Sequence, residues 1–236
     1  MAESYERWRP SYAPELVAWV AEELRLGPGR TVVDVAAGTG KLTRQLVPTG
    51  ARVVAVEPLD EMRVELAAAV PGAVALAGAA EELPLPDASA DAITVASAMH
   101  WFDLDRALPE LHRVLRPGGR LAVLDQGRDL ADALQQQVQA VIGPYVPDPA
   151  GFRRWRDELA ASGLFGQLED RETSFEQLLE ADGLAERIGT ISYVARLPAE
   201  ERARVLDRIR AIGRAQRRSP FPFRYRALAA VCARVD

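Results

Sequence analysis

Two glycines follow a buried acidic residue in a segment whose residue types suit ligand binding. Asp34 interrupts the apolar run 31–37, and Gly38-Thr39-Gly40 comes directly after that run. Glycine lets the backbone adopt positive φ and approach a ligand closely, and the start of the following helix favours an anionic group. Because an unpaired buried carboxylate is costly, we expect Asp34 to order the turn through backbone amides or to contact an amino group of a ligand.

A second acidic residue, Glu57, ends the next apolar run, 52–56. A carboxylate at this distance from a glycine turn can accept hydrogen bonds from the two hydroxyls of a ribose. The alternative interpretation is that Glu57 caps the next helix or faces solvent. In that helix, Met62 suits packing and contact with an adenine equally well.

A histidine follows a later apolar run, 92–98, and is the best candidate for proton transfer. The ordinary pKa of histidine, about 6.5, suits a general base, although His100 can also simply pack or hydrogen-bond there. Its neighbour Trp101 could form the wall of a ligand pocket or fill a core. The other histidine, His112, is expected on the polar side of a helix, in contact with solvent.

The composition excludes several classes of protein. A single cysteine, Cys232, excludes an intramolecular disulfide framework, and with only two histidines no transition-metal site is expected. The formal net charge of −5 argues against a general nucleic-acid binder. Apolar runs are too short for a membrane span, and the N-terminus has no apolar signal core, so a cytoplasmic location is expected.

The elements that position these residues alternate between strands and helices. Five apolar runs predict buried strands, at 31–37, 52–56, 73–77, 92–98 and 121–124. Helical stretches between them predict a parallel sheet with helices on both faces, and right-handed crossovers make it doubly wound. Ligands of such sheets bind at the carboxyl ends of the strands. Beyond this core we expect helices at 130–142 and 152–159 and strands at 167–175 and 223–235.

Two common nucleotide motifs fit the glycine turn poorly. A P-loop needs glycine where Val35 stands and serine or threonine where Leu42 follows Lys41. The dinucleotide pattern needs its third glycine where Thr43 stands. A nicotinamide-dependent oxidoreductase remains an alternative, with that missing glycine against it.

The segment Asp34-Val35-Ala36-Ala37-Gly38-Thr39-Gly40 resembles the first motif of the class I S-adenosylmethionine-dependent methyltransferases. That motif is an acidic residue followed by Gly-x-Gly-x-Gly, and Ala36 replaces its first glycine. Four later segments are similar to family segments in the same order, at 53–62, 78–87, 91–102 and 111–119. The resemblance covers about residues 31–126.

The resemblance implies roles for individual residues. The implied cofactor-binding residues are Asp34, Ala36, Gly38, Thr39, Gly40, Glu57, Pro58, Met62, Ala80, Glu81 and Ser97. Many relatives carry Asp or Ser where Ala79 stands, so backbone groups near Ala80 and Glu81 would read the adenine edge. His100 would face the methyl group as the catalytic residue. Tyr5, Arg9 and Tyr12 could close over the methionine carboxylate, and Trp101 and Tyr193 would contact the acceptor.

The resemblance also implies the fold and the reaction. We expect one methyltransferase domain, 1–236, with a seven-stranded sheet of order 3-2-1-4-5-7-6 whose last strand is antiparallel. Residues 1–30 would form a lid segment, 31–127 the cofactor-binding core, and 128–236 the cap helices and last strands. The expected function is methyl transfer from S-adenosylmethionine to a small-molecule acceptor, without a metal. Oligomeric state is not predicted.

An arginine cluster near the C-terminus leaves other functions open. Its members are Arg202, Arg204, Arg208, Arg210, Arg214, Arg217, Arg218, Arg224 and Arg226, against one acid, Asp207. The usual explanation of such a cluster is a helix face exposed to solvent. The functional alternative is that the arginines bind an anionic acceptor or RNA. An RNA methyltransferase and a non-catalytic cofactor-binding protein on the same frame therefore stay as alternatives.

Overall fold

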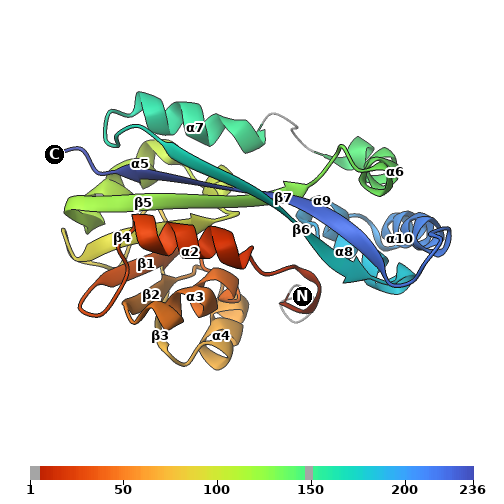
Figure 1. Ribbon diagram of the computed structural model, residues 1–236, viewed down its shortest axis with the longest axis horizontal. Helices are drawn as coiled ribbons and strands as arrows, with labels where there is room; N and C mark the ends of the chain where they lie inside the picture. The colour runs from red at the N-terminus through yellow and green to blue at the C-terminus, as the bar shows by residue number, and fades with distance from the viewer. Residues whose placement is uncertain (1–5, 147–150) are drawn as a thin grey trace. The chain divides into compact units, whose positions relative to one another are not determined.

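The computed structural model describes residues 6–146 and 151–236, with side chains except at 151–154 (Figure 1). The strands are β1 Thr31–Val35, β2 Arg52–Val56, β3 Ala73–Leu76, β4 Ala90–Ala96, β5 Leu115–Arg128, β6 Glu169–Leu179 and β7 Phe221–Ala233. The helices are α2 Pro14–Glu23, α3 Lys41–Leu46, α4 Asp60–Ala69, α5 Leu104–Val114, α6 Ala133–Ile142, α7 Gly151–Ala161, α8 Ala181–Gly189, α9 Ser192–Ala195 and α10 Ala199–Arg214. Short 3-10 helices lie at Val47–Thr49, Met99–Trp101 and Gly143–Tyr145.

The strands form one sheet in the order β3-β2-β1-β4-β5-β7-β6, which confirms the predicted fold. The strands β1 to β5 pair in parallel, with Val33 of β1 beside Val54 of β2 and Ile93 of β4. Figure 1 shows β7 running against its neighbours β5 and β6. The carboxyl ends of β1, β2 and β4 therefore lie along one edge of the sheet.

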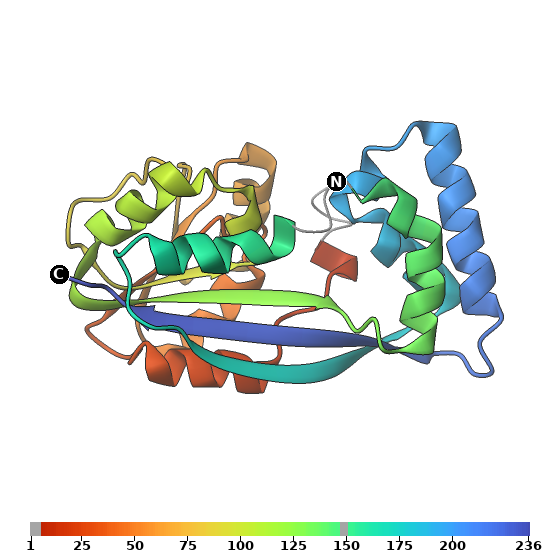
Figure 2. The ribbon, with the colours of Figure 1, turned by 90° about the horizontal axis from the view of Figure 1, so that it is seen from above.

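The central strands are continuous apolar runs because helices cover both of their faces. All of β1 except its first residue is buried, and so is β4 except its last. Figure 2 shows α2 on one side of β5 and β7, with α5 and α7 on the other side. The outer strand β6 is largely exposed and alternates only weakly.

Some local details differ from what the residue types suggest. Asp60, of a type that often caps helices, is instead the first residue of α4 and pairs with Arg63 at 2.6 Å, while the cap position belongs to Leu59. His112 is not simply solvated, because its Nε2 lies 2.6 Å from the carbonyl oxygen of Val235 and its ring meets Phe165 edge-on. Residues 117–119, Pro-Gly-Gly, lie within the bounds of β5, next to an irregular pairing with β4.

The chain divides into two compact units. The sheet unit consists of Ser11–Gln126, Ala150–Thr173 and Ala227–Asp236. The helical unit consists of Met1–Pro10, Gly127–Pro149 and Ser174–Arg226, so it takes the ends of three long strands together with α6, α8, α9 and α10. Each unit has its own apolar core. No helix in the described ranges is both long and apolar enough to cross a bilayer.

Candidate functional site

The glycine turn joins β1 to α3 through three residues of positive φ. These are Ala36 at 55°, Gly38 at 58° and Gly40 at 82°. Backbone hydrogen bonds fix the turn, from the amide of Ala37 to Val56 at 3.1 Å and from the amide of Gly40 to Ala37 at 2.9 Å. The alanine that replaces the family's first glycine therefore adopts a left-handed conformation that glycine would adopt without strain.

The two glycines of the turn lack a side chain for different reasons. A Cβ on Gly40 would lie 2.9 Å from Cγ2 of Val70 and 3.1 Å from Cγ of Leu66, so this position is closed by packing. A Cβ on Gly38 would meet nothing within 4 Å. The backbone at Gly38 therefore borders open space at the carboxyl edge of the sheet, where a ligand can approach it closely.

Asp34 orders the base of the turn through side-chain hydroxyls. The Thr43 hydroxyl donates to one carboxylate oxygen at 2.6 Å, and the Thr94 hydroxyl donates to the other at 2.9 Å. Burial raises the pKa of Asp34 to about 6, although both hydroxyls act to lower it. The sequence analysis anticipated backbone amides, and the amide of Thr43 does bond the carboxylate. It missed both threonine hydroxyls, because partners on α3 and β4 depend on the tertiary fold.

Glu57 links the second strand to the glycine turn. Its carboxylate is almost fully buried and accepts the amide of Gly38 at 2.8 Å and that of Leu59 at 3.0 Å. Each carboxylate oxygen can accept more than one hydrogen bond. Glu57 can therefore hold the turn in place and still accept hydrogen bonds from ligand hydroxyls.

A serine and a tyrosine meet where β4 ends. Ser97 has a φ of 54°, and its amide donates to Leu124 of β5 at 2.7 Å. The Tyr12 hydroxyl donates to the Ser97 hydroxyl at 3.2 Å. Gln45 of α3 bonds both the amide and the carbonyl of Tyr12, a fixing contact that sequence patterns do not reveal. Two predicted site residues are thus brought together.

His100 and Trp101 lie in the 3-10 helix that follows β4. Their rings are tilted with centroids 5.0 Å apart. His100 is half-buried, and burial lowers the pKa of its imidazole. Trp101 is 60% exposed, which excludes the core-filling role and leaves its indole available for contact with a ligand.

The remaining predicted cofactor residues occupy varied surroundings. Ala80 is buried in the sheet-unit core, and Glu81 accepts the amide of Asp103 at 2.9 Å. Met62 is half-buried, whereas Thr39 is fully buried. Pro58 is exposed. Glu81 therefore secures the loop 78–87 against the start of α5.

The predicted residues for the lid and the acceptor fall in different parts of the chain. Tyr5 lies outside the described residues. Arg9 belongs to the helical unit and donates to the hydroxyl and carbonyl oxygens of Thr190, at 3.1 and 3.0 Å. Tyr193, in α9, belongs to the same unit. Of the described members of this set, Tyr12 and Trp101 lie in the sheet unit.

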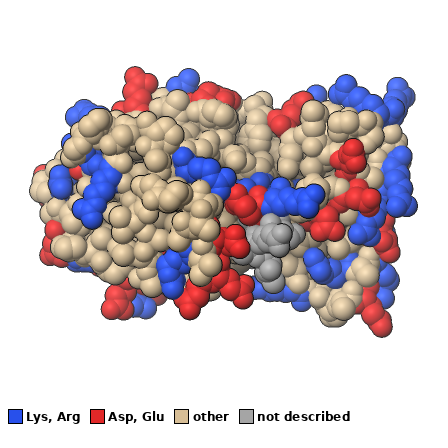
Figure 3. Space-filling view, turned by 90° about the horizontal axis from the view of Figure 1, so that it is seen from below, with Lys and Arg blue, Asp and Glu red and all other residues tan. Residues whose placement is uncertain are grey.

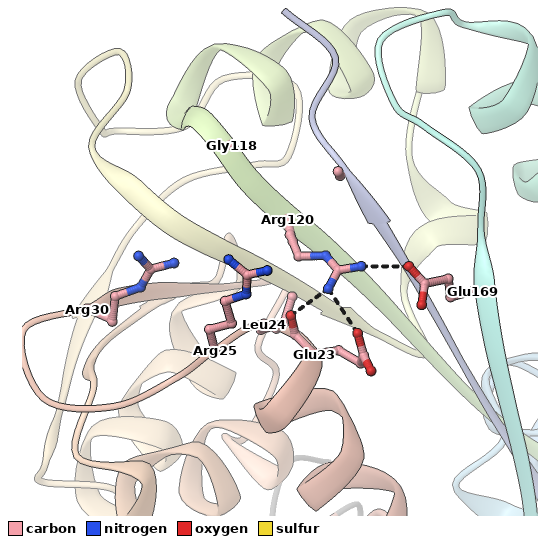
Figure 4. A pocket seen from close by; sticks show the side chains of 8 residues that line it. Glu23, Leu24, Arg25, Arg30, Gly118, Arg120 and Glu169 are labelled. Atoms are coloured by element: carbon pink, nitrogen blue, oxygen red, sulfur yellow. Dashed lines mark hydrogen bonds and ion pairs between the residues drawn. The ribbon is translucent and has the colours of Figure 1, made fainter.

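A separate cavity of about 470 Å³ lies at the amino ends of the parallel strands (Figure 4). Arg120 points into it and pairs with Glu23 at 2.9 Å and Glu169 at 2.8 Å. Both terminal nitrogens of Arg120 are therefore paired with carboxylates, and ligands of open parallel sheets bind at the opposite edge. We therefore regard these contacts as structural, tying α2 to β5 and β6.

Acidic side chains from other parts of the sequence neutralise some members of the arginine cluster. Arg210 pairs with Asp182 and Asp207, and Arg224 pairs with Glu176 and Asp132. The face drawn in Figure 3 shows basic and acidic side chains interspersed. Within the described residues, no group of His, Cys, Asp and Glu side chains could hold a metal ion.

Comparison with known proteins gives a consistent set of relatives. The family model described as a methyltransferase domain matches residues 33–123. An uncharacterized methyltransferase of Mycobacterium tuberculosis is 41% identical over 209 residues, which cover 89% of this chain and 82% of the relative. An uncharacterized methyltransferase-like protein of Schizosaccharomyces pombe is 30% identical over 231 residues, covering 95% and 90%.

Solved structures agree in fold. A protein of Anaeromyxobacter dehalogenans assigned as a type II methyltransferase has a TM-score of 0.69 and 27% identity, covering 95% of this chain and 97% of its own. Geranyl diphosphate methyltransferase in complex with SAM has a TM-score of 0.53 and 16% identity, covering 94% and 85%, a likeness of fold alone. The similarity therefore extends far beyond the glycine turn.

Proposed function

Because this chain belongs to the class I S-adenosylmethionine-dependent methyltransferase family, and is therefore an enzyme, we propose that it transfers a methyl group from S-adenosylmethionine to a small-molecule acceptor. The open space beside Gly38 carries this proposal. It lies next to the Glu57 carboxylate, which can accept hydrogen bonds from the two hydroxyls of a ribose. The residues present therefore fit a nucleoside ligand.

The other cofactor contacts follow from the positions around this turn. Asp34 holds the start of α3, next to the turn, through its hydrogen bond with Thr43. Ser97 and Tyr12 are hydrogen-bonded to each other where β4 ends. Ala80 and Glu81 would offer backbone groups to the adenine edge. We assign the remaining family positions, Ala36, Thr39, Gly40, Pro58 and Met62, to the same cofactor site.

The acceptor side of the proposal rests on His100, with Trp101 and Tyr193 as acceptor contacts. S-adenosylmethionine supplies, when bound, a methyl group on a sulfonium that is already activated. Proximity and alignment can then provide most of the rate. Because burial lowers its pKa, His100 is neutral near pH 7 and can accept a proton from an acceptor that must lose one.

The test is calorimetric binding of S-adenosylhomocysteine to the whole chain and to two alanine variants. Gly38→Ala places a methyl group in the open space and should weaken binding at least about tenfold, a loss of ~1.4 kcal/mol. Gly163→Ala is the matched control, because Gly163 also has positive φ, 68°, with nothing near its Cβ. It should bind normally.

Either of two results would overturn the cofactor assignment. One is the absence of binding by the well-folded chain, and the other is equal binding by the Gly38 and Gly163 variants. An acceptor screen that detects S-adenosylhomocysteine then tests the small-molecule class, with RNA as the contrasting substrate. In that screen, His100→Gln should lower turnover without changing S-adenosylhomocysteine affinity.

A further inference from the structure

Two arginines of the helical unit, Arg128 and Arg187, lie beside Tyr225 and have no carboxylate partner among the described residues. The amide of Asp129, next to Arg128, donates to the carbonyl of Arg224, next to Tyr225, at 3.2 Å. The guanidinium carbon of Arg187 lies 5.5 Å from the centroid of the Tyr225 ring. Arg187, in α8, is 5% exposed, and its Nε donates to the Tyr225 hydroxyl at 2.9 Å. That hydroxyl donates onward to Gln177 at 3.0 Å. Arg128, at the end of β5, donates to the side-chain oxygen of Gln139. All of these partners are neutral.

The two guanidinium groups are left with unused donors. Nη1 of Arg187 and Nη1 of Arg128 are both buried and without a hydrogen-bond partner. Across residues 6–146 and 151–236, neither arginine forms an ion pair. Burial lowers the pKa of Arg128, and the nearby charge of Arg187 acts in the same direction. Two buried cations this close are costly unless an anion joins them.

The surroundings indicate what such an anion would contact. Tyr193 packs against the core cluster that contains Tyr225, the residue bonded by Arg187. Burial raises the pKa of the Tyr193 hydroxyl, and the charges of Arg128, Arg9 and Arg187 oppose that rise. Arg128 and Tyr193 are half-buried, so part of each of these two side chains is exposed to solvent. Arg187 is too deeply buried for a flat macromolecular surface to reach, which favours a small ligand.

We propose that Arg128, Arg187 and Tyr193 bind the carboxylate or phosphate group of a small organic molecule. The planar guanidinium matches both anions with paired hydrogen bonds, and the tyrosine hydroxyl adds another donor. If the chain has the proposed function, this molecule is the methyl acceptor. The enzyme would then select acceptors that carry an acidic group. Anion binding itself does not depend on that step.

The experiment measures binding of benzoate and phenyl phosphate by titration calorimetry, with benzyl alcohol as the neutral probe. At least one anion should bind the whole chain, and benzyl alcohol should bind at least about tenfold more weakly. Arg128→Gln should weaken the anion by about the same factor. Arg210→Gln is the matched control, because Arg210 is already ion-paired in the same unit. It should bind as the wild type does.

A stability measurement separates a ligand-binding arginine from a structural one. Without ligand, Arg187→Met removes a buried charge that has no carboxylate, so its melting temperature should equal or exceed that of the wild type. Added anion should then raise the melting temperature of the wild type alone. A lower melting temperature for ligand-free Arg187→Met, or equal anion affinity in Arg128→Gln and wild type, would overturn the inference.

The outcome is independent of cofactor binding. S-adenosylhomocysteine binding without anion binding refutes the anion site and leaves the proposed function intact. Anion binding without S-adenosylhomocysteine binding supports the anion site and refutes the proposed function. If both ligands bind, methylation assays with carboxylate-bearing and phosphate-bearing acceptors distinguish the two sources of the anionic group.

Discussion

Gly40 should be far less tolerant of a methyl group than another glycine with the same backbone conformation. Gly40 and Gly29 both have a φ of 82°. A Cβ on Gly29 meets nothing within 4 Å, whereas a Cβ on Gly40 meets Val70 at 2.9 Å and Leu66 at 3.1 Å. Gly40→Ala and Gly29→Ala therefore share the conformational strain and differ in packing.

The expected magnitudes follow from these two contributions. An alanine forced into the left-handed region costs ~1–2 kcal/mol, so Gly29→Ala should lose about that much stability. Overpacking of a core adds ~1–3 kcal/mol, and the partners of Gly40 are buried aliphatic groups of α4 and of the residue that follows it. Gly40→Ala should therefore be ~1–3 kcal/mol less stable than Gly29→Ala.

Urea denaturation followed by circular dichroism measures both variants. Adding Val70→Ala to Gly40→Ala should make the double variant more stable than the sum of the single losses, because the new methyl group gains space. Equal losses in Gly40→Ala and Gly29→Ala would refute the reasoning, and so would strict additivity with Val70→Ala. Either result would mean that the neighbours shift without cost.

Two further predictions concern buried titratable groups in the sheet unit. The pKa of Asp34 is about 6 against an ordinary 3.8, so its contribution to stability is fully present below about pH 4 and is lost as the pH rises through 6. Relative to wild type, Asp34→Asn should gain ~3 kcal/mol in unfolding free energy between about pH 4 and pH 7.5, and a pH-independent difference would contradict this. Cys232 is fully buried, with a pKa raised to about 12 by burial, so Ellman's reagent should label it only after urea unfolding. Rapid labelling of the native protein would contradict this prediction.

The central strands could be predicted from the sequence because both of their faces are buried. Apolar runs such as 52–56 and 92–98 therefore carry a clear signal. The order of the strands came from family resemblance, since periodicity does not specify neighbours. The last part of β5 is polar and β6 is mostly exposed, so their apolar patterns do not mark where the strands end. The division into two units was likewise hidden, because three strands run through it.

The candidate site was predictable in its residues but not in their contacts. Gly38, Glu57 and Ser97 follow strands, so a parallel sheet brings them to one edge whatever the details of packing. The contacts around them depend on Thr43, which bonds Asp34, on Tyr12, which bonds Ser97, and on Gln45, which fixes Tyr12. These three residues come from α3 and from the segment before α2, and no local rule places them. Thr43 stands where a dinucleotide-binding motif would carry its third glycine. Its hydroxyl bond to Asp34 gives that departure a physical reason.

The pairing of buried charges separates scaffold from binding site in this chain. Asp34 receives two hydroxyls, and Arg120 has a carboxylate on each terminal nitrogen, so removing a partner of either should lower stability. Arg128 and Arg187 have only neutral partners, and removing their charge should cost the ligand-free protein nothing. Keeping two buried guanidinium groups without carboxylate partners lowers the stability of the ligand-free protein, and a bound anion would restore that stability. Substitutions at these two arginines should therefore move stability and ligand affinity in opposite directions, which no purely structural ion pair does.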